Sequence, residues 1–277
     1  MLRIVASAMV LVSVALAAGA PRAQALESVV TIASPLASKG PFTAHLLRPS
    51  GPGQSPAIVA LHGCSGLLDS KGHLRSRELD WANRLIAAGY TMLFPDSFTA
   101  RGLHEICSAR QRTIFPKDRA EDAAAAAAWL ASQPFVDKGR LALMGWAHGA
   151  MAVLWTVRPG FLSAPAPFKT AVAFYPGCRQ IADRLPDWRP SLPLTLLIGS
   201  ADDWTEPAPC RELARRTGFR FIEYAGAYHE FDAPDAPLHM RKGLGAVKGG
   251  EAHAGTDPVA RAAAIEEVMG LLRATLR

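Results

Sequence analysis

The chain has 277 residues, of which 49% are hydrophobic and 19% are charged. This composition is too apolar for a disordered chain, and the length is sufficient for one large globular domain. The formal net charge is +6, but the basic residues are scattered among acidic ones and form no stripe that would indicate nucleic-acid binding. We therefore expect no nucleic-acid partner.

The first 25 residues have the pattern of a secretory signal. A short basic start with Arg3 precedes an apolar run over residues 4–19, and Ala23 and Ala25 form a small-x-small cleavage site. The run is shorter than the roughly 20 residues that cross a bilayer, so a cleaved signal is favoured over a membrane anchor. We expect residues 1–25 to be removed and residues 26–277 to form a single domain. That domain would be exported to the periplasm or secreted, with no attachment to the membrane.

Strand-like and helix-like runs alternate along the rest of the chain. Residues 28–49 are expected to form a pair of antiparallel edge strands. Strands are then predicted at 56–61, 90–95, 140–144, 170–175, 193–198 and 219–224, and helices at 78–89, 117–132, 148–157, 209–217 and 258–277. Apolar strands that alternate with helices predict an α/β fold, in which a mostly parallel sheet is covered on both faces. Residues 232–257 are the least regular segment, and Val259, Ala263, Val268, Leu271 and Leu272 predict the apolar face of the last helix.

The most informative segment follows the predicted strand at 140–144. Gly145 and Gly149 frame a strand-to-helix turn of the form G-x-S-x-G, with Ala147 at its centre. The glycines permit a sharp, strained turn that lifts the central side chain above the sheet. An anion that develops there would also lie near the positive end of the following helix. Alanine, however, has no atom that can attack a carbonyl group, so the nucleophile of this elbow is missing.

Two later segments supply the other members of a nucleophile–acid–histidine triad in the expected chain order. Asp202 and Asp203 follow the strand at 193–198, and a carboxylate there would orient an imidazole and stabilise its charged form. Asp202, three residues after the strand-end Gly199, is the preferred acid, whereas Asp203 is interpreted as a turn or capping residue. His229 follows the last strand and would move the proton between nucleophile and leaving group.

The loop after the first parallel strand is a candidate oxyanion hole. It contains Gly63 and Gly66, and its backbone N–H groups can be aimed at a developing anion. The backbone amides of Cys64 and His148 are the expected donors. Ser65 is a weaker candidate nucleophile, because nothing in its spacing creates a strained elbow.

Other features carry less functional information. Residues 242–250 are rich in glycine but lack the G-K-[ST] ending of a phosphate-binding loop. The four cysteines have no CxxC spacing, which argues against a zinc site, and in an oxidising compartment they would pair in one of three ways. We expect no metal or cofactor. Aromatic residues that flank the predicted site, and that would line a pocket or pack in the core, are Phe98, Trp146, Trp204, Tyr228 and Phe231.

The complete set of motifs resembles the dienelactone hydrolase family of α/β-hydrolases. The matching segments are LHGCSG, PDSF, GWAHGA, GSADDWTEPAPC and YAGAYHEFD, which extend over nearly all of the chain after residue 25. The resemblance implies an eight-stranded core that hydrolyses esters or lactones of small carboxylic acids. The triad roles would then belong to position 147, Asp202 and His229. Family members have serine or cysteine at the elbow, and Ala147 departs from that pattern.

The strand order usual for this fold also implies a disulfide pairing. It places the strand that ends at Cys64 beside the strand before Cys107, and the strand that ends near Cys178 beside the strand before Cys210. The expected disulfides are therefore Cys64–Cys107 and Cys178–Cys210, each with Cα atoms about 4.4–6.8 Å apart.

These observations predict an exported ester or lactone hydrolase scaffold whose partner is a small-molecule substrate. Loss of serine or cysteine at position 147, whether natural or engineered, would leave the chain inactive or nearly so. The alternative is a non-catalytic protein that binds a small carboxylate or ester in the same pocket. Peptidase activity has less support, because nothing marks a separate gating domain. The oligomeric state is left open.

Overall fold

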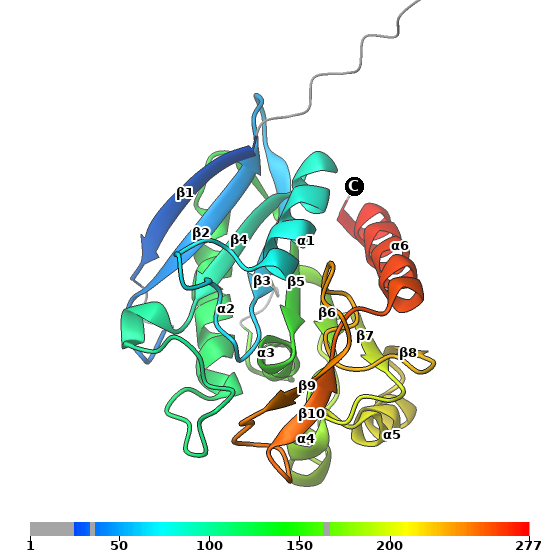
Figure 1. Ribbon diagram of the computed structural model, residues 1–277. Helices are drawn as coiled ribbons and strands as arrows, with labels where there is room; N and C mark the ends of the chain where they lie inside the picture. Colours follow the sequence, from blue (N-terminus) through cyan, green and yellow to red (C-terminus); the bar gives the residue numbers. More distant parts are fainter. Residues whose placement is uncertain (1–24, 34–36, 163–166, 277) are drawn as a thin grey trace, which may run out of the picture.

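The computed structural model describes residues 25–33, 37–162 and 167–276 (Figure 1). The predicted signal segment lies outside this part of the chain, apart from Ala25, where the first strand begins. None of the helices in the described ranges is both long enough and apolar enough to cross a membrane.

An eight-stranded sheet forms the centre of the molecule, in the order β1-β2-β4-β3-β5-β6-β7-β8. β1 pairs with β2, and β2 with β4, in antiparallel orientation, whereas the remaining neighbours are parallel. The strands are β1 (Ala25–Ile32), β2 (Phe42–Pro49), β3 (Ser55–Leu61), β4 (Thr91–Asp96), β5 (Val136–Trp146), β6 (Phe168–Phe174), β7 (Leu194–Gly199) and β8 (Arg220–Tyr224). The predicted α/β fold with a mostly parallel sheet is thus confirmed.

Helices cover both faces of this sheet. They are α1 (Ser76–Ala87), α2 (Pro116–Ala131), α3 (His148–Thr156), α4 (Arg179–Arg184), α5 (Pro207–Thr217) and α6 (Pro258–Leu276), with a short 3₁₀ helix, η1 (Thr99–Arg101). Parallel strands are joined by right-handed crossovers. The chain moves from β3 to β4 in one direction across the sheet and from β4 back to β5 in the other, so α1 and α2 lie on opposite faces. Arg261 of α6 forms an ion pair with Asp80 of α1 at 2.6 Å, so α6 lies beside α1 (Figure 1).

The central strands of the sheet are strongly apolar because both of their faces pack against other apolar side chains. Residues 57–61 of β3 and 171–174 of β6 are completely buried, which explains their continuous apolar sequences. In α6 the buried residues are Ala260, Ala264, Val268, Leu272 and Leu276. The predicted apolar face of this helix was therefore partly wrong, since Val259 is 80% exposed.

Residues 232–257 are more regular than expected. They contain an antiparallel pair, β9 (His239–Lys242) and β10 (Glu251–Ala254). A parallel bridge between His229 and Ala254 attaches this hairpin to the segment after β8. β9 carries exposed and charged residues and has no apolar alternation. β10 alternates, with Ala252 and Ala254 buried, but over only four residues, which is too short a run to predict a strand.

The sheet changes its direction of winding at β3. The chain crosses from β3 to β4 on one side and then returns to β5 on the other side of β3. Ligands of open α/β sheets bind outside the carboxyl ends of the strands at such a point. The loop after β3 and the elbow after β5 meet there.

Gly149 permits this close meeting. A Cβ atom at position 149 would lie 2.0 Å from the carbonyl oxygen of Leu61, a distance that no side chain can tolerate. Gly145 is similarly tight, because its Cβ would lie 2.7 Å from the backbone of Gly149. Both glycines of the elbow are therefore needed for α3 to pack against the end of β3.

We predict that Gly149→Ala destabilises the fold by about 3 kcal/mol or more, because the methyl group would collide with backbone that cannot move independently. Gly270→Ala is the matched control. Gly270 lies inside α6 with open space around its Cα atom, so alanine there should stabilise the protein by about 0.5–1 kcal/mol. Urea unfolding of both variants measures the difference, and equal effects would contradict this account of the elbow.

Candidate functional site

Ala147 occupies a strained position between β5 and α3. Its backbone has φ 49° and ψ −113°, outside the regions that alanine normally adopts. Its amide donates a hydrogen bond to the carbonyl oxygen of Phe174 at 2.9 Å, and its own carbonyl accepts one from the amide of Met151. A strained non-glycine residue held between two elements is what a nucleophile elbow requires. The predicted turn between β5 and α3 is present, and the side chain at its centre is the methyl group of Ala147.

Asp202 and His229 form a buried pair near the ends of β7 and β8. His229 Nδ1 lies 2.8 Å from Asp202 Oδ2, and the two side chains are 1% and 0% exposed. A carboxylate only accepts hydrogen bonds, so Nδ1 is the donor in this contact. The other carboxylate oxygen accepts hydrogen bonds from the amides of Trp204 and Thr205. Asp203 instead contacts His253, at 2.7 Å, near the surface.

Tyr175 connects the elbow to this pair. Trp146 of the elbow pairs with Phe174 at the end of β6, and Tyr175 follows directly. The ring of Tyr175 lies 4.5 Å from the ring of His229, between centroids. The structure therefore brings position 147, His229 and Asp202 to the same edge of the sheet.

The loop after β3 lies against the elbow on its other side. A Cβ atom at Gly63 would be 3.8 Å from Cβ of Ala147. His148 is the first residue of α3, so its amide has no carbonyl partner within the helix. Cys64 follows Gly63, and its carbonyl accepts a hydrogen bond from Ile106. The two amides expected to stabilise an oxyanion thus come from segments that contact each other.

The predicted disulfide pairing is confirmed. Cys64–Cys107 and Cys178–Cys210 both have Cα atoms 5.0 Å apart. The first joins the candidate oxyanion loop to the segment after β4. The second joins the segment after β6 to α5, which follows the Asp202 loop. Each bridge closes a long loop on one side of the site and thereby restricts it.

Two residues of the site were not identified from the sequence. Thr205 Oγ1 lies 3.0 Å from Asp202 Oδ2, 3.0 Å from the carbonyl oxygen of Tyr175 and 3.1 Å from His229 Nδ1. Tyr175 is completely buried and has φ 40°. The position of Thr205 three residues after an acid is a common turn pattern, and Tyr175 looks like the end of a strand, so neither had a distinctive signal.

A charged network that the sequence analysis also missed lies beside the elbow, where Arg77 packs over the ring of Trp146 at 5.4 Å. Arg77 and Glu78 of α1 form a buried ion pair at 2.6 Å, and Arg77 also lies 3.6 Å from Glu230. Burial raises the pKa of Glu78, although Arg77 opposes that change. Burial likewise acts to raise the pKa of Glu230, but the cations Arg77 and Arg241 and nearby His229 bring it below its ordinary value.

Two buried histidines lie behind the candidate oxyanion loop. His62 and His148 are 0% and 3% exposed, and Nη1 of buried Arg119 lies 3.2 Å from His148 Nδ1. Burial, reinforced by the positive charge of Arg119, lowers the pKa of both imidazoles well below 6.5. Both side chains are therefore neutral at physiological pH.

Of the five aromatic residues proposed to flank the site, Trp204 has the clearest place in it. Its ring lies 4.6 Å from that of His229, and Arg241 lies over its ring at 5.0 Å. Tyr228 contacts His253 instead. The other three, Phe98, Trp146 and Phe231, are completely buried and belong to the core.

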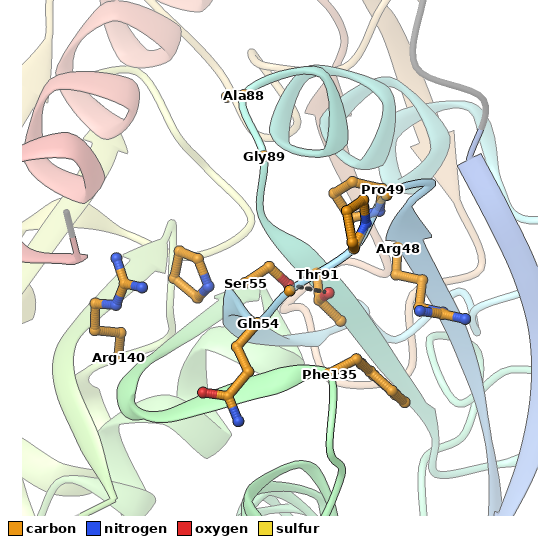
Figure 2. A pocket seen from close by; sticks show the side chains of 13 residues that line it. Arg48, Pro49, Gln54, Ser55, Ala88, Gly89, Thr91, Phe135 and Arg140 are labelled. Atoms are coloured by element: carbon orange, nitrogen blue, oxygen red, sulfur yellow. Dashed lines mark hydrogen bonds between the residues drawn. The ribbon is translucent and has the colours of Figure 1, made fainter.

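Hollows occur at both ends of the sheet. One of about 390 Å³ lies beside the candidate site, where Trp204, Thr205 and Gly177 contribute to its lining. Another, of about 340 Å³, is lined by Ser55 and Thr91 at the amino ends of β3 and β4 (Figure 2). A third, of about 580 Å³, is lined by Leu67 and Glu105 in the loops after β3 and β4. Ligands of such sheets bind at the carboxyl ends of the strands, where the first and third hollows lie. The first is lined by Thr205, which contacts Asp202 and His229. No group of three or more potential metal ligands is found among the residues described.

Comparison with known proteins agrees with this fold. A model described as "Dienelactone hydrolase family" matches residues 42–276. A dienelactone hydrolase from Anabaena variabilis is 20% identical with a TM-score of 0.57, over 76% of this chain and 91% of that one. A dienelactone hydrolase-like promiscuous phosphotriesterase from metagenomic libraries is 18% identical with a TM-score of 0.59, over 91% and 99%.

A larger enzyme has the same fold in part of its chain. Dipeptidyl peptidase 4 from Porphyromonas gingivalis is 18% identical with a TM-score of 0.53, over 74% of this chain and only 32% of that one. The search of curated proteins gives no match. At these identities the structural matches establish the fold.

The two buried histidines predict how stability depends on pH. Their pKa values are lower in the folded chain than in the unfolded chain, so the unfolded state binds more protons below pH 6.5. The free energy of unfolding should therefore decrease as the pH falls below about 6.5, by roughly 1 kcal/mol per pH unit for each histidine. Urea unfolding between about pH 5 and pH 7.5 measures this slope.

Two variants test the assignment of that slope. His62→Asn removes one of the two groups and should reduce the slope by about half. His73→Gln is the control, because the His73 side chain is 75% exposed, and it should leave the slope unchanged. A slope that is insensitive to His62→Asn would rule out the buried histidines as its source.

Proposed function

The chain belongs to the dienelactone hydrolase family, and from this premise we propose that it is a carboxylic ester or lactone hydrolase scaffold inactive through Ala147. The observation that carries the proposal is the buried 2.8 Å contact between His229 Nδ1 and Asp202 Oδ2, close to a strained elbow. Packing alone does not require an acid and an imidazole at these two buried positions, whereas a nucleophile at position 147 would require both.

With serine at position 147 each group would have a defined role. His229 Nε2 would accept the proton of the hydroxyl as its oxygen attacks the substrate carbonyl, and Asp202 would stabilise the imidazolium that forms. The amides of Cys64 and His148 would donate hydrogen bonds to the oxyanion. His229 would then protonate the leaving alcohol, and water would release the acid from the acyl-enzyme. In the chain as it stands the first of these steps has no nucleophile.

The substrate that we propose is a small ester or lactone. The family supports this class of compound, and the hollow of about 390 Å³ beside Trp204 and Thr205 is of a size suited to a small molecule. We further propose that the protein is exported. The basic and apolar pattern of residues 1–25 supports a cleaved signal, and two disulfides are compatible with an oxidising compartment.

Restoring the nucleophile tests the function. We predict negligible hydrolysis of short-chain p-nitrophenyl esters by the chain as given, and a gain of up to about 10⁶-fold in kcat for Ala147→Ser. Ser65→Ala in the unaltered chain is the control, because it removes the competing candidate hydroxyl and should change nothing. A folded Ala147→Ser protein that binds small acids or esters in calorimetry but does not hydrolyse them would instead support the alternative of a non-catalytic binding protein.

The two neighbouring aspartates provide a matched pair for the acid. In the Ala147→Ser protein, Asp202→Asn should lower kcat by about 10⁴-fold, because the amide no longer orients and stabilises the imidazolium. Asp203→Asn breaks a similar contact to His253 near the surface and should change kcat by less than about threefold. Steady-state kinetics on the same esters distinguishes the two, and the opposite order of effects would transfer the acid role to Asp203.

A further inference from the structure

Asp232 is a buried carboxylate that binds three aromatic side chains from three elements. It is completely buried and lies three residues after His229. Its Oδ2 accepts hydrogen bonds at 2.8 Å from the indole N–H groups of both Trp81 and Trp146. Its Oδ1 accepts a hydrogen bond from the hydroxyl of Tyr175. The proposed triad does not use this group.

Two of the three donors adjoin the candidate catalytic positions. Trp146 is the residue directly before Ala147, and Tyr175 packs its ring against that of His229. The carbonyl oxygen of Tyr175 also lies 3.0 Å from Thr205 Oγ1, which contacts Asp202. One carboxylate therefore joins the elbow, the residue beside the imidazole and the segment that carries the imidazole.

The backbone around this carboxylate is strained. Within the described ranges four non-glycine residues have positive φ, and three of them are Ala147, Tyr175 and Glu230. Such conformations persist only where the surrounding contacts over-determine them. The hydroxyl of Tyr175 has two partners, since it donates to Asp232 and accepts a hydrogen bond from Arg77 at 3.2 Å. Burial, together with Asp232, raises the pKa of Tyr175, so the hydroxyl keeps the proton that it donates.

We infer that Asp232 is a positioning residue that sets the separation between position 147 and the imidazole of His229. It does so by tying Trp146 and Tyr175 to the loop that carries His229. The inference rests on the proposed function, because it assigns Asp232 a part in the same reaction. Its carboxylate touches neither the substrate nor the reacting atoms. A carboxylate suits this task because two oxygens accept three hydrogen bonds, whereas an amide offers one acceptor oxygen.

The kinetic test uses the Ala147→Ser protein. Asp232→Asn should lower kcat by about 100-fold with KM changed by less than about threefold, because misplacement of the imidazole affects the chemical step rather than ground-state binding. Tyr175→Phe, which removes only the hydroxyl, should also lower kcat, and it keeps the test available if Asp232→Asn does not fold. The double variant should be no slower than Asp232→Asn alone, because both changes break the same link.

Trp188→Phe is the matched control for a purely structural role. Trp188 is also buried, and its indole N–H donates to the carbonyl oxygen of Leu154, near the end of α3 remote from Ala147. This variant should lose stability without a change in kcat. If Asp232→Asn and Tyr175→Phe behave like Trp188→Phe, the positioning role is overturned.

A measurement on the unaltered chain separates this inference from the proposed function. In proton NMR, the Nδ1–H resonance of His229 should shift in both Asp232→Asn and Tyr175→Phe. The resonance of His253, which contacts Asp203 near the surface, serves as the internal reference and should not shift. An inactive Ala147→Ser protein with a shifted His229 resonance would refute the hydrolase proposal while supporting the positional role of Asp232. An unshifted resonance in both variants would refute that role.

Discussion

The close contact between the first turn of α3 and the end of β3 is the constraint on which the site depends. Gly149 lies so near the carbonyl of Leu61 that no other residue fits there. This contact places the start of α3 beside the loop that contains Gly63 and Cys64. The backbone amides of Cys64 and His148 therefore lie close to position 147, with no side chain between them. The winding reversal of the sheet at β3 creates the space above this contact.

Opposite that contact, polar side chains fix the remaining members of the site. Asp202 receives two backbone amides and His229, so its charge is satisfied although it is buried. Asp232 is satisfied in a similar way by two indoles and a phenol. Asp202 binds His229 of the segment after β8, and Asp232 of the same segment binds Trp146 and Tyr175. The positive φ values of Ala147 and Tyr175 persist because the surrounding contacts over-determine the local backbone.

The two disulfides restrain loops of the site that the hydrogen bonds of the sheet do not hold in place. Loops at the carboxyl ends of strands are the more mobile parts of an α/β fold. Cys64–Cys107 closes the loop beside the candidate oxyanion amides, and Cys178–Cys210 closes the one beside Asp202 and Trp204. The β9–β10 hairpin adds a third restraint, because the bridge at His229 and the contact between Asp203 and His253 attach it to the same edge.

The sequence by itself determined the strands of the sheet, the helices other than the short α4 and η1, and the chain order of position 147, Asp202 and His229, because apolar periodicity and glycine spacing are local signals. Once the resemblance supplied a strand order, the disulfide pairing also followed. Only the tertiary structure distinguished the partners of Asp202 and Asp203, and only it identified Thr205, Tyr175 and Asp232. Their roles arise from contacts between segments far apart in the chain, which leave no periodic pattern. The β9–β10 hairpin escaped prediction because each strand has only four residues and β9 is mostly exposed, so neither gives a periodic apolar signal of useful length.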